Sequence, residues 1–352
     1  MKVSVIGCGN VGVALAADLS IGGQEVAIVK TTQTNKETFE KIRENGNSLY
    51  IKEDGRYQKA VISKMTYDLS EIANTDVIFV TIQSTYHEHL IKKMSRYLRD
   101  DHIVVVVCSY LSSCYFKKYC SASPIIAETT GPYLEGRVET NDISGEIVFR
   151  VGCRLSRSPM SVTPSSRADE CMRKLNALYE GLTNEYSSIE SALLNPNMVL
   201  HTVGSIMSIP RIEFSDGNFC MYREAYSRKN EATMRIMLAL DNEKKKVLTA
   251  LGCNPIDIFI ASSFVGDPVE SFYEYSESSD RALSPTSVRS RYITEDVSQG
   301  LVLFESIAAR LGIPTPIATS MIDIAGAALG RDFRSEGRTI DKMGVTDLSM
   351  IG

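Results

Sequence analysis

The stretch Gly-Cys-Gly-Asn-Val-Gly at residues 7–12 constrains this chain more than any other, because a strand-like run precedes it and a helix-like run follows it. Residues 2–6 (KVSVI) are typical of a short buried strand, and residues 13–19 (VALAADL) of a helix. A G-x-G-x-x-G pattern in this strand–turn–helix setting is the fingerprint of a dinucleotide-binding βαβ unit. The chain is therefore expected to open with a Rossmann-type, doubly wound parallel sheet.

Each glycine of this turn has its own physical task. Gly7 permits the tight turn, Gly9 lets a pyrophosphate approach the backbone, and Gly12 lets the helix pack closely on the strand. The free N–H groups of the helix N-terminus then face the phosphates. The predicted cofactor-binding residues of the turn are Gly7, Gly9, Asn10, Val11 and Gly12. The alternative is a tight structural turn that binds no ligand.

The end of the second strand-like run, residues 25–29, bears on the choice of cofactor. An NAD-preferring site usually carries an acidic residue there for the ribose 2′-hydroxyl, but the chain has Lys30 and Thr31, followed by further hydroxyl-bearing residues. A lysine among hydroxyls suits a 2′-phosphate. We therefore expect NADP(H) to be favoured over NAD(H), with Lys30 and Thr31 in the site; in the alternative, this is a solvated turn in which Lys30 touches nothing.

Strand-like and helix-like runs continue to alternate through the first half. The strand-like runs are 77–82 and 103–107, with shorter candidates at 125–127 and 146–151, and the helix-like runs are 86–98, 111–119 and 167–180. This alternation predicts parallel βαβ units. Because ligands of such sheets bind at the carboxyl ends of strands, the loops containing Gln83 and Glu128 are expected near the nicotinamide, although each could be an ordinary turn. His87 and His89 are expected at the surface.

The second half has a different pattern. From about residue 187 the sequence is mostly helical, and residues 221–251 form one long amphipathic pattern that ends at Gly252. A chain of 352 residues also exceeds the ~250–300 at which single cores stop growing. We therefore expect a dinucleotide-binding domain at residues 1–186 and an all-helical substrate and catalytic domain at residues 187–352.

Composition excludes several classes of partner. The net charge is −5 with no basic stripe, so nucleic acid is not expected. No apolar run approaches the ~20 residues of a membrane span, and the first residues lack the apolar core of a signal peptide. The eight cysteines form no C-x-x-C pair and no zinc-like spacing with histidine, so we expect reduced thiols, a cytoplasmic location and no metal.

His201 is the only histidine outside the first third of the chain, and it lies on a predicted helix. Asn195 reads as the helix cap and Pro196 as its first residue, which puts His201 on the second turn. An unperturbed imidazole pKa of ~6.5 suits proton transfer near neutrality. The alternative is a satisfied core histidine on an apolar helix. Asn197, four residues earlier, could share its face as a substrate contact or only help to cap the helix.

A second informative stretch, Arg291-Tyr292-Ile293-Thr294-Glu295-Asp296, leads into a helix predicted to run to about residue 311. Asp296 is expected in the first turn, where a carboxylate is stabilised by unpaired N–H groups and the helix dipole. Arg291 could be an ordinary surface charge. Spacing alone leaves both the functional and the structural interpretations open.

Taken together, these motifs resemble the opine dehydrogenases, the octopine/nopaline dehydrogenase group. The resemblance extends in order along nearly the whole chain. Its motifs are the glycine-rich turn at 7–12, Asn195-Pro196-Asn197 with His201, Arg291-Tyr292 with Asp296, Gly312-Ile313-Pro314-Thr315-Pro316, and Glu336-Gly337-Arg338-Thr339. The chain departs from the family pattern at Ser298-Gln299, where a Pro-Tyr pair is expected.

The resemblance implies a Rossmann domain joined to a helical domain, and reductive condensation of an amino acid with a 2-oxo acid by NAD(P)H. It implies that His201 and Asp296 are the catalytic pair and that Arg291 holds a substrate carboxylate. The chemistry of an imine agrees with these roles, because loss of water needs a proton donor near neutral pH. Asp296 would fix the imidazole tautomer.

Two other functions fit the first half of the chain. A dehydrogenase of the glycerol-3-phosphate or 2-hydroxy-acid type would share the dinucleotide-binding domain but reduce a ketone without an amine. A non-catalytic NADP(H) sensor would bind cofactor and turn nothing over. Residues 317–329, a helical stretch rich in alanine and other apolar residues, could pack internally or between the subunits of a homodimer.

Overall fold

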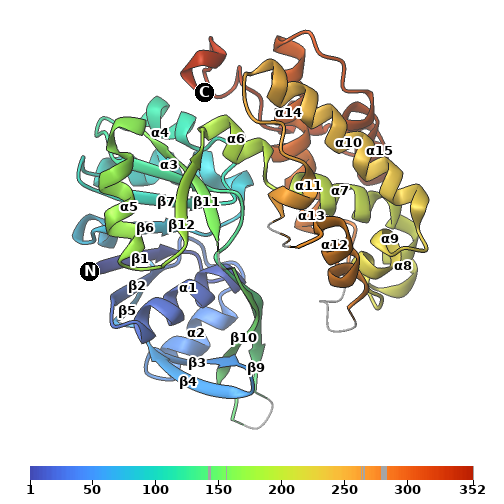
Figure 1. Ribbon diagram of the computed structural model, residues 1–352. Coiled ribbons are helices and arrows are strands. Elements are labelled where there is room, and N and C mark those ends of the chain that lie inside the picture. The colour runs from blue at the N-terminus through green and yellow to red at the C-terminus, as the bar shows by residue number, and fades with distance from the viewer. Residues whose placement is uncertain (142–143, 156, 263, 265, 279–283, 352) are drawn as a thin grey trace. The chain divides into compact units, whose positions relative to one another are not determined.

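The computed structural model describes residues 1–141, 144–155, 157–262, 264, 266–278 and 284–351. The chain divides into two compact units, Met1–Ser191 and Ala192–Gly352 (Figure 1). The division falls within the short helix α6 (Ser188–Leu193), a few residues beyond the boundary expected after residue 186.

The first unit is built on a large sheet with strand order β12-β11-β8-β7-β6-β1-β2-β5. Its strands are β1 (Lys2–Ile6), β2 (Glu25–Val29), β5 (Lys64–Thr66), β6 (Val77–Val80), β7 (Ile103–Val107), β8 (Ile125–Thr129), β11 (Ser158–Thr163) and β12 (Leu182–Tyr186). The six strands β5, β2, β1, β6, β7 and β8, which are adjacent in that order, run parallel to one another, whereas β11 runs antiparallel to β8. The predicted Rossmann-type parallel sheet is confirmed, with a reversed pair of strands at one edge.

The helices of this unit follow the strands, as the alternating pattern predicts. They are α1 (Asn10–Ile21), α2 (Glu37–Glu44), α3 (His87–Met94), α4 (Ser113–Tyr119) and α5 (Ala168–Asn176), with 3-10 turns η1 (Leu69–Asn74), η2 (Ser84–Tyr86), η3 (Ser95–Tyr97) and η4 (Ser165–Arg167). β7 is five consecutive buried residues, Ile-Val-Val-Val-Val, because strands in the middle of a parallel sheet are covered on both faces.

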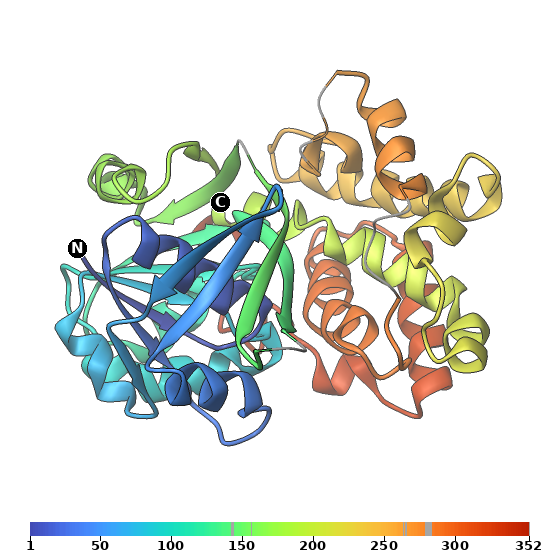
Figure 2. The same cartoon turned by 90° about the horizontal axis from the view of Figure 1, so that it is seen from below.

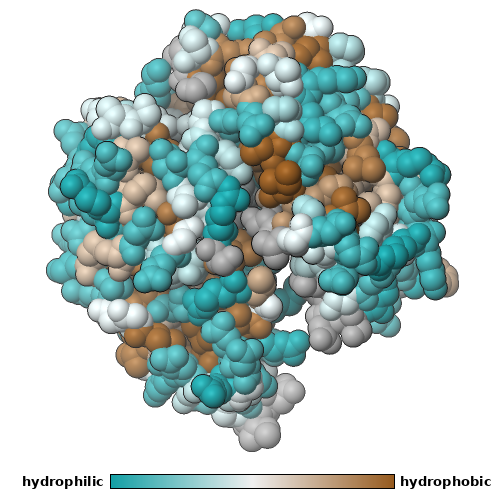
Figure 3. Space-filling view, viewed as in Figure 1, coloured by the Kyte–Doolittle hydropathy of each residue, from teal (hydrophilic) through white to brown (hydrophobic). Residues whose placement is uncertain are grey.

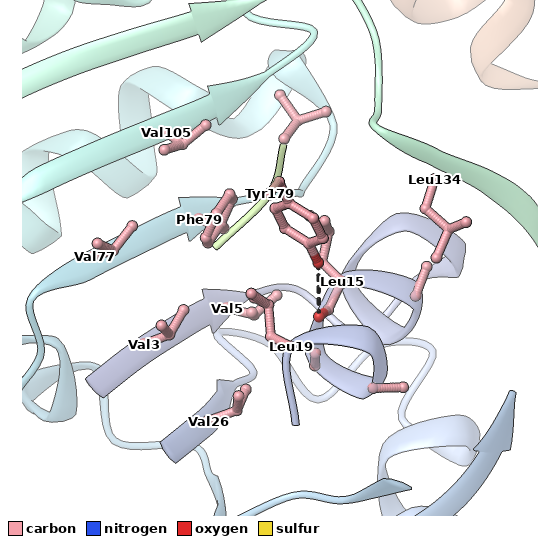
Figure 4. Close-up of a cluster of buried hydrophobic side chains, with 14 of the residues drawn as sticks. Val3, Val5, Leu15, Leu19, Val26, Val77, Phe79, Val105, Leu134 and Tyr179 are labelled. Atoms are coloured by element: carbon pink, nitrogen blue, oxygen red, sulfur yellow. Dashed lines mark hydrogen bonds between the residues drawn. The ribbon is translucent and has the colours of Figure 1, made fainter. Parts of the chain in front are cut away.

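The core of the large sheet contacts α1 directly. In Figure 4, Val3, Val5, Val77 and Val105 extend from three neighbouring strands on the side where Leu15 and Leu19 of α1 lie. Tyr179 is buried in the same cluster, and its hydroxyl donates to the carbonyl of Leu15 at 3.5 Å. Each fully buried aliphatic side chain contributes about 1.5–3 kcal/mol, so this cluster fixes α1, and with it the glycine-rich turn.

A smaller sheet packs on the other side of α1, and the sequence patterns predict it only in part. Its strands, in the order β4-β3-β10-β9, are β3 (Ser48–Glu53), β4 (Arg56–Val61), β9 (Leu134–Thr140) and β10 (Ile147–Arg154). Figure 2 shows β3 and β4 in blue beside β9 and β10 in green. Because α1 contacts strands of both sheets, its residues from Gly12 to Ala17 are all buried. Of these four strands, only 146–151 is predicted.

The β3–β4 hairpin carries a turn signal of its own. Asp54 and Gly55 join the two strands with φ values of +49° and +77°. An Asp-Gly pair with two positive φ angles is the turn that joins adjacent antiparallel strands without opposing their twist. The hairpin could therefore have been predicted from this dipeptide.

All the regular elements among the described residues of the second unit are helical. Its helices are α7 (Asn197–Met207), α8 (Ile209–Ser215), α9 (Met221–Tyr226), α10 (Glu231–Ala250), α11 (Ile258–Ala261), α12 (Pro268–Glu277), α13 (Arg291–Glu295), α14 (Val302–Arg310), α15 (Pro316–Leu329) and α16 (Phe333–Glu336); the π-helical turn η5 (Asp296–Leu301) joins α13 to α14, and the 3-10 turn η6 (Leu348–Met350) lies near the end. The predicted helical second domain is confirmed.

Residues 221–251 form two helices, so the prediction of one long helix is wrong. α9 ends at Tyr226 and α10 begins at Glu231, and Ser227 between them is extended, with φ −76° and ψ 162°. The polar run Ser-Arg-Lys-Asn at 227–230 offers no apolar face to continue the helix. None of the helices in the described part of the chain has both the length and the apolar character needed to cross a bilayer. On the face in Figure 3, hydrophilic side chains predominate over both units, with hydrophobic patches among them.

Candidate active site

The glycine-rich turn has the geometry that a dinucleotide requires. Gly7 has φ +120°, and a Cβ on it would lie 2.7 Å from Thr81 Oγ1. A Cβ on Gly12 would lie 2.3 Å from the carbonyl oxygen of Gly7, so only glycine lets α1 start this close to the strand. A Cβ on Gly9, in contrast, would meet nothing within 4 Å. The space in front of Gly9 is therefore open to a ligand, while Gly7 and Gly12 hold the turn together.

Asn10 and Val11 have different surroundings from those of the glycines. Asn10 is the first residue of α1, and its Oδ1 accepts a hydrogen bond from the backbone N–H of Val138 on β9 at 2.9 Å. The side chain of Val11 packs against the hydrophobic core. No side chain caps the N-terminus of α1. The backbone N–H groups of its first turn are therefore the groups that can bind a phosphate.

Lys30 folds back on its own loop, so the alternative in which it touches nothing is wrong. The side chain is largely buried, and Nζ donates to the carbonyl of Thr34 at 2.8 Å. Burial raises the pKa of the Cys8 thiol, inside the glycine-rich turn, to about 12, and the positive charge of Lys30 opposes this rise. The ammonium thus acts electrostatically on the turn itself. Thr31, the next residue, is half-buried.

Glu128 does not lie in a loop, contrary to expectation. It belongs to β8 and is fully buried, and its Oε1 accepts hydrogen bonds from Ser109 Oγ at 2.6 Å and from the N–H of Ser113 at 3.0 Å. The carboxylate therefore holds the loop after β7 and the start of α4. Gln83 does lie in a loop, exposed after β6.

The expectation that His87 lies at the surface is wrong. The residue is fully buried at the start of α3, and its ring bridges Ser112 Oγ at 2.7 Å and the carbonyl of Ile82 at 3.1 Å. His89, two residues later, is exposed as expected. The helical period could have distinguished the two histidines, because His87 lies on the same helix face as the buried Leu90, Ile91 and Met94, and His89 does not.

The loop that His87 and Glu128 support has an unusual backbone. Cys108, Tyr110 and Leu111 have φ values of +56°, +49° and +63°. Left-handed non-glycine residues cost about 1–3 kcal/mol each and cluster at functional sites. The loop follows the carboxyl end of β7, where ligands of parallel sheets bind. Sequence patterns miss this feature because none of these residues is glycine.

In the second unit, α7 begins as the Asn-Pro-Asn motif predicts, within one residue. Asn195 Oδ1 accepts from the N–H of Asn197 at 3.0 Å, and the carbonyl of Pro196 accepts from Leu200 at 2.8 Å. The half-buried Asn197 side chain makes no hydrogen bond to another described residue. The cap fixes the helix start, and His201 lies on the second turn with its side chain 6% exposed.

His201 and Asp296, 95 residues apart in sequence, meet in a buried hydrogen bond, with Nδ1 and Oδ2 2.8 Å apart. An ionised carboxylate can only accept, so Nδ1 carries the proton and Nε2 keeps its lone pair. None of the described residues hydrogen-bonds Nε2. Burial lowers the pKa of His201, Asp296 opposes this effect, and the charge of Arg291 adds to it. The free imidazole is therefore neutral at pH 7.

Asp296 is not in the first turn of its helix, so the capping explanation for it is wrong. The helix begins at Arg291, with Ser290 as its cap, and Asp296 opens the π-helical turn η5. π-Helical turns are rare and occur frequently at functional sites. The N–H of Arg338 donates to the carbonyl of Ser298 at 2.9 Å, and Ser298 Oγ donates to the carbonyl of Thr294 at 2.7 Å. These bonds satisfy carbonyls within and beside the turn.

Arg291 lies one helical turn before Glu295 and has a partly exposed side chain. Its Nη1 is 3.7 Å from Glu295 Oε2, and its guanidinium carbon is 5.5 Å from the centre of the Tyr292 ring. The structure thus brings Arg291, Asp296 and His201 together through α13 and α7. Among the described residues there is no group of three or more histidine, cysteine or acidic side chains suited to a metal.

Tyr292 lies in the Arg291–Asp296 stretch, but the sequence patterns assign it no role. Its ring stacks on the imidazole of His201 with 3.7 Å between ring centroids and 6° between planes. Arg291 and Asp296 draw attention to this stretch of sequence, but the stacking of Tyr292 on His201 depends on how α13 packs on α7. Only the tertiary structure provides that information.

A Rossmann-type unit followed by a helical unit with a buried His–Asp pair defines a two-domain dehydrogenase. Residues 3–109 match the family described as ketopantoate reductase PanE/ApbA, and residues 185–329 match the family described as NAD/NADP octopine/nopaline dehydrogenase, alpha-helical domain. The chain is 25% identical to vitopine synthase of Allorhizobium ampelinum (strain ATCC BAA-846 / DSM 112012 / S4), over 97% of this chain and 95% of that protein. It is 22% identical to opine dehydrogenase of Arthrobacter sp. (strain 1C), over 99% and 96%.

Solved structures have the same fold. Octopine dehydrogenase with NADH and L-arginine has a TM-score of 0.72 at 17% identity, over 99% of this chain and 97% of that one. Yersinopine dehydrogenase with NADP+ bound has a TM-score of 0.68 at 12% identity, over 100% and 95%. The match of the helical domain and the relatives along nearly the whole chain support the opine dehydrogenase family for this protein. It is an NAD(P)-dependent oxidoreductase of the class that acts on CH–NH donors.

Proposed function

We propose that this protein reductively condenses an amino acid with a 2-oxo acid at the expense of NAD(P)H. The observation that carries the proposal is the buried His201–Asp296 pair, whose Nε2 is left without a partner among the described residues. The matched octopine/nopaline dehydrogenase domain and the full-length similarity to vitopine synthase and opine dehydrogenase support the same chemistry.

The protonation state of His201 sets the order of steps. A neutral imidazole takes a proton at Nε2 from the ammonium group of the amino acid, which frees the amine to attack the carbonyl carbon of the oxo acid. Attack gives a carbinolamine, and the imidazolium, held at Nδ1 by Asp296, returns the proton to its hydroxyl group, so that water departs and the protonated imine (iminium) remains. A bound NAD(P)H would supply the hydride that converts the iminium carbon to the secondary amine.

Arg291 is proposed to bind a substrate carboxylate. Its guanidinium is partly exposed on the helix that also carries Asp296, and the planar group can hold a carboxylate through two parallel hydrogen bonds. Such a contact would orient the oxo acid and the imine for hydride addition. Asn197, half-buried at the start of α7, is proposed as a second polar substrate contact.

Cofactor binding is proposed for residues 1–186, with the glycine-rich turn on the pyrophosphate. NADP(H) is favoured over NAD(H), since Lys30 and Thr31 directly follow β2 and no acidic residue stands there to bind a 2′-hydroxyl. Val11, Gln83 and Glu128 complete the proposed set, Val11 through its backbone N–H. Because Glu128 is buried, its part is to hold the loop after β7 in shape.

The decisive experiment follows oxidation of NADPH and NADH at the nicotinamide absorbance. Pyruvate, 2-oxoglutarate and glyoxylate are each tested with and without a pooled amino-acid mixture. Oxidation that requires both an oxo acid and an amine supports the proposal. Oxidation with an oxo acid alone identifies a hydroxy-acid dehydrogenase, and tight cofactor binding without any turnover favours the sensor.

Two further properties belong to the proposal. A cytoplasmic location is supported by the eight cysteines, none of which forms a disulfide. A homodimer is supported by α15, where Ile324 is 45% exposed on a helix rich in alanine. Sedimentation equilibrium of the purified protein tests the second point, since a mass of one chain, 38.9 kDa, would exclude the dimer.

A further inference from the structure

Two side chains of one helix hold the His201 imidazole from two directions. Asp296 accepts from the ring edge at Nδ1, at 2.8 Å. Tyr292 covers a ring face, with the two ring centroids 3.7 Å apart and the planes nearly parallel. Tyr292 and Asp296 are four residues apart in a helix that begins at Arg291, so they lie on the same helix face.

Tyr292 is itself held in place. It packs against a buried cluster of Ile212, Phe219 and Met221, which come from α8, the loop after it and α9. The ring is therefore fixed between this cluster and the imidazole. A side chain fixed in this way can restrict its neighbour, whereas a mobile surface tyrosine could not.

We propose that Tyr292 is a positioning residue for His201: its ring fixes the plane of the imidazole, so that Nδ1 keeps its bond to Asp296 and Nε2 points at the substrate. This inference rests on the proposed role of His201 in proton transfer. Rotation of the ring out of the stack would break the Nδ1 bond and turn Nε2 away. The aromatic face also stabilises the imidazolium that forms during the reaction.

The charges around the imidazole make this restraint important. Asp296 attracts the imidazolium, and Arg291 opposes it. The Arg291 guanidinium also lies 5.5 Å from the centre of the Tyr292 ring. The ring thus stands beside the cationic arginine and beside the histidine, which becomes cationic when it takes up the substrate proton, and its π-electrons interact favourably with both cations.

Kinetics of three variants test the proposal. Tyr292→Phe keeps the stack and removes the hydroxyl, and Tyr292→Leu keeps an apolar side chain and removes the stack. Tyr222→Leu is the matched control, because Tyr222 packs on the same cluster but its ring meets Tyr226 at a tilt and Tyr275 edge to face. We expect Tyr292→Leu to lose kcat by roughly tenfold, the value of one aromatic contact, with unchanged KM for cofactor.

The Phe variant should recover at least half of the wild-type kcat, and Tyr222→Leu should keep kcat even where its melting temperature falls. Equal losses of kcat in Tyr292→Leu and Tyr222→Leu would assign the effect to the apolar cluster and overturn the proposal. A large loss in Tyr292→Phe would overturn it as well, because the hydroxyl and not the stack would then be the active feature.

A measurement without turnover separates this proposal from the proposed function. The chain has four histidines, so the ¹⁵N signals of the His201 ring can be assigned by loss in His201→Ala. Wild type and Tyr292→Phe should show the single tautomer with the proton on Nδ1, and Tyr292→Leu a mixture. One unmixed tautomer in all three proteins would overturn the positioning role even if the enzyme assay supports the reaction. A mixture in the Leu variant supports it even if the oxo acid and amine prove to be wrong.

Discussion

Single residues in this protein differ sharply in how much of their role the sequence reveals. The glycines at 7, 9 and 12 and the histidine at 201 belong to patterns whose physical reasons are local. Asp296 could be noticed, but its contact with His201 joins positions 95 residues apart. Tyr292 and His87 owe their roles to packing between helices and loops, which no local pattern records. Substitutions of single residues therefore test these roles most directly.

Replacement of His201 by alanine should reduce kcat by about 10²–10⁴-fold, because general acid–base catalysis contributes that much. Cofactor affinity should stay as in the wild type, because the cofactor phosphates are proposed to bind the glycine-rich turn and not His201. Steady-state kinetics and a fluorescence titration with NADPH provide the two measurements. The exposed His89→Ala is the control. Turnover within a few-fold of wild type would show that His201 is not the proton carrier.

The decrease of kcat/KM at acid pH should reflect the lowered pKa of His201. The free enzyme needs the neutral imidazole to accept the substrate proton, so kcat/KM falls as the pH drops through the His201 pKa. Because burial lowers this pKa in the folded protein, the fall should be centred below the ordinary value of ~6.5. Measurements from pH 4.5 to pH 8 in buffers of constant ionic strength test this, and a midpoint above 6.5 would contradict it.

Lys30→Asp should move cofactor preference from NADPH towards NADH, because a carboxylate repels a 2′-phosphate and accepts from a 2′-hydroxyl. A change of about tenfold or more in the ratio of the two kcat/KM values is expected for one charge-assisted contact. Lys36→Asp, further along the same loop, controls for net charge. If both variants keep the wild-type ratio of the kcat/KM values for NADPH and NADH, this loop does not contact the 2′ position of the cofactor ribose.

Within the element formed by β1, the glycine-rich turn and α1, different glycines serve cofactor binding and folding. A Cβ on Gly12 meets backbone at 2.3 Å, whereas a Cβ on Gly9 meets nothing within 4 Å. Gly12→Ala should therefore destabilise the protein, whereas Gly9→Ala should fold normally and lose cofactor affinity, because its methyl group occupies the space that a pyrophosphate needs. Thermal unfolding without ligand and NADPH titration measure the two effects. Equal melting temperatures for the two variants would contradict this division.

Elements differ in predictability for physical reasons. β6 and β7 are continuous apolar runs, β1 is mostly apolar, and α1 is apolar except for Asn10, Asp18 and Ser20, so these elements could be predicted from the pattern along the chain. The strands of the smaller sheet are half exposed, and β4 has a single buried residue, Ala60, so its pattern is weak. The break between α9 and α10 lies at four polar residues, 227–230, and the helical patterns before and after them do not reveal it.

For the whole molecule, two units with separate cores predict separate responses to ligands. Binding of NADPH should slow hydrogen exchange in the first turn of α1 and at the end of β2. The backbone of α7 should be unaffected until a substrate is also added. Hydrogen exchange followed by mass spectrometry on the full chain distinguishes these regions. Protection of α7 by cofactor alone would show that the second unit takes part in cofactor binding.

The π-helical turn that begins at Asp296 has a consequence for how this chain tolerates length changes. A π turn contains one residue more than the α-helical turn that would span the same rise. Deleting one residue between 297 and 300 would turn this segment into an ordinary α-helical turn, and an unbroken α-helix could then run from Arg291 to Arg310. The helical residues on either side would keep their faces, whereas losing one residue from a regular α-helix turns everything beyond it by about 100°. A shorter chain is therefore tolerated better here than within α10 or α15, and the change falls on the widened turn that begins at Asp296.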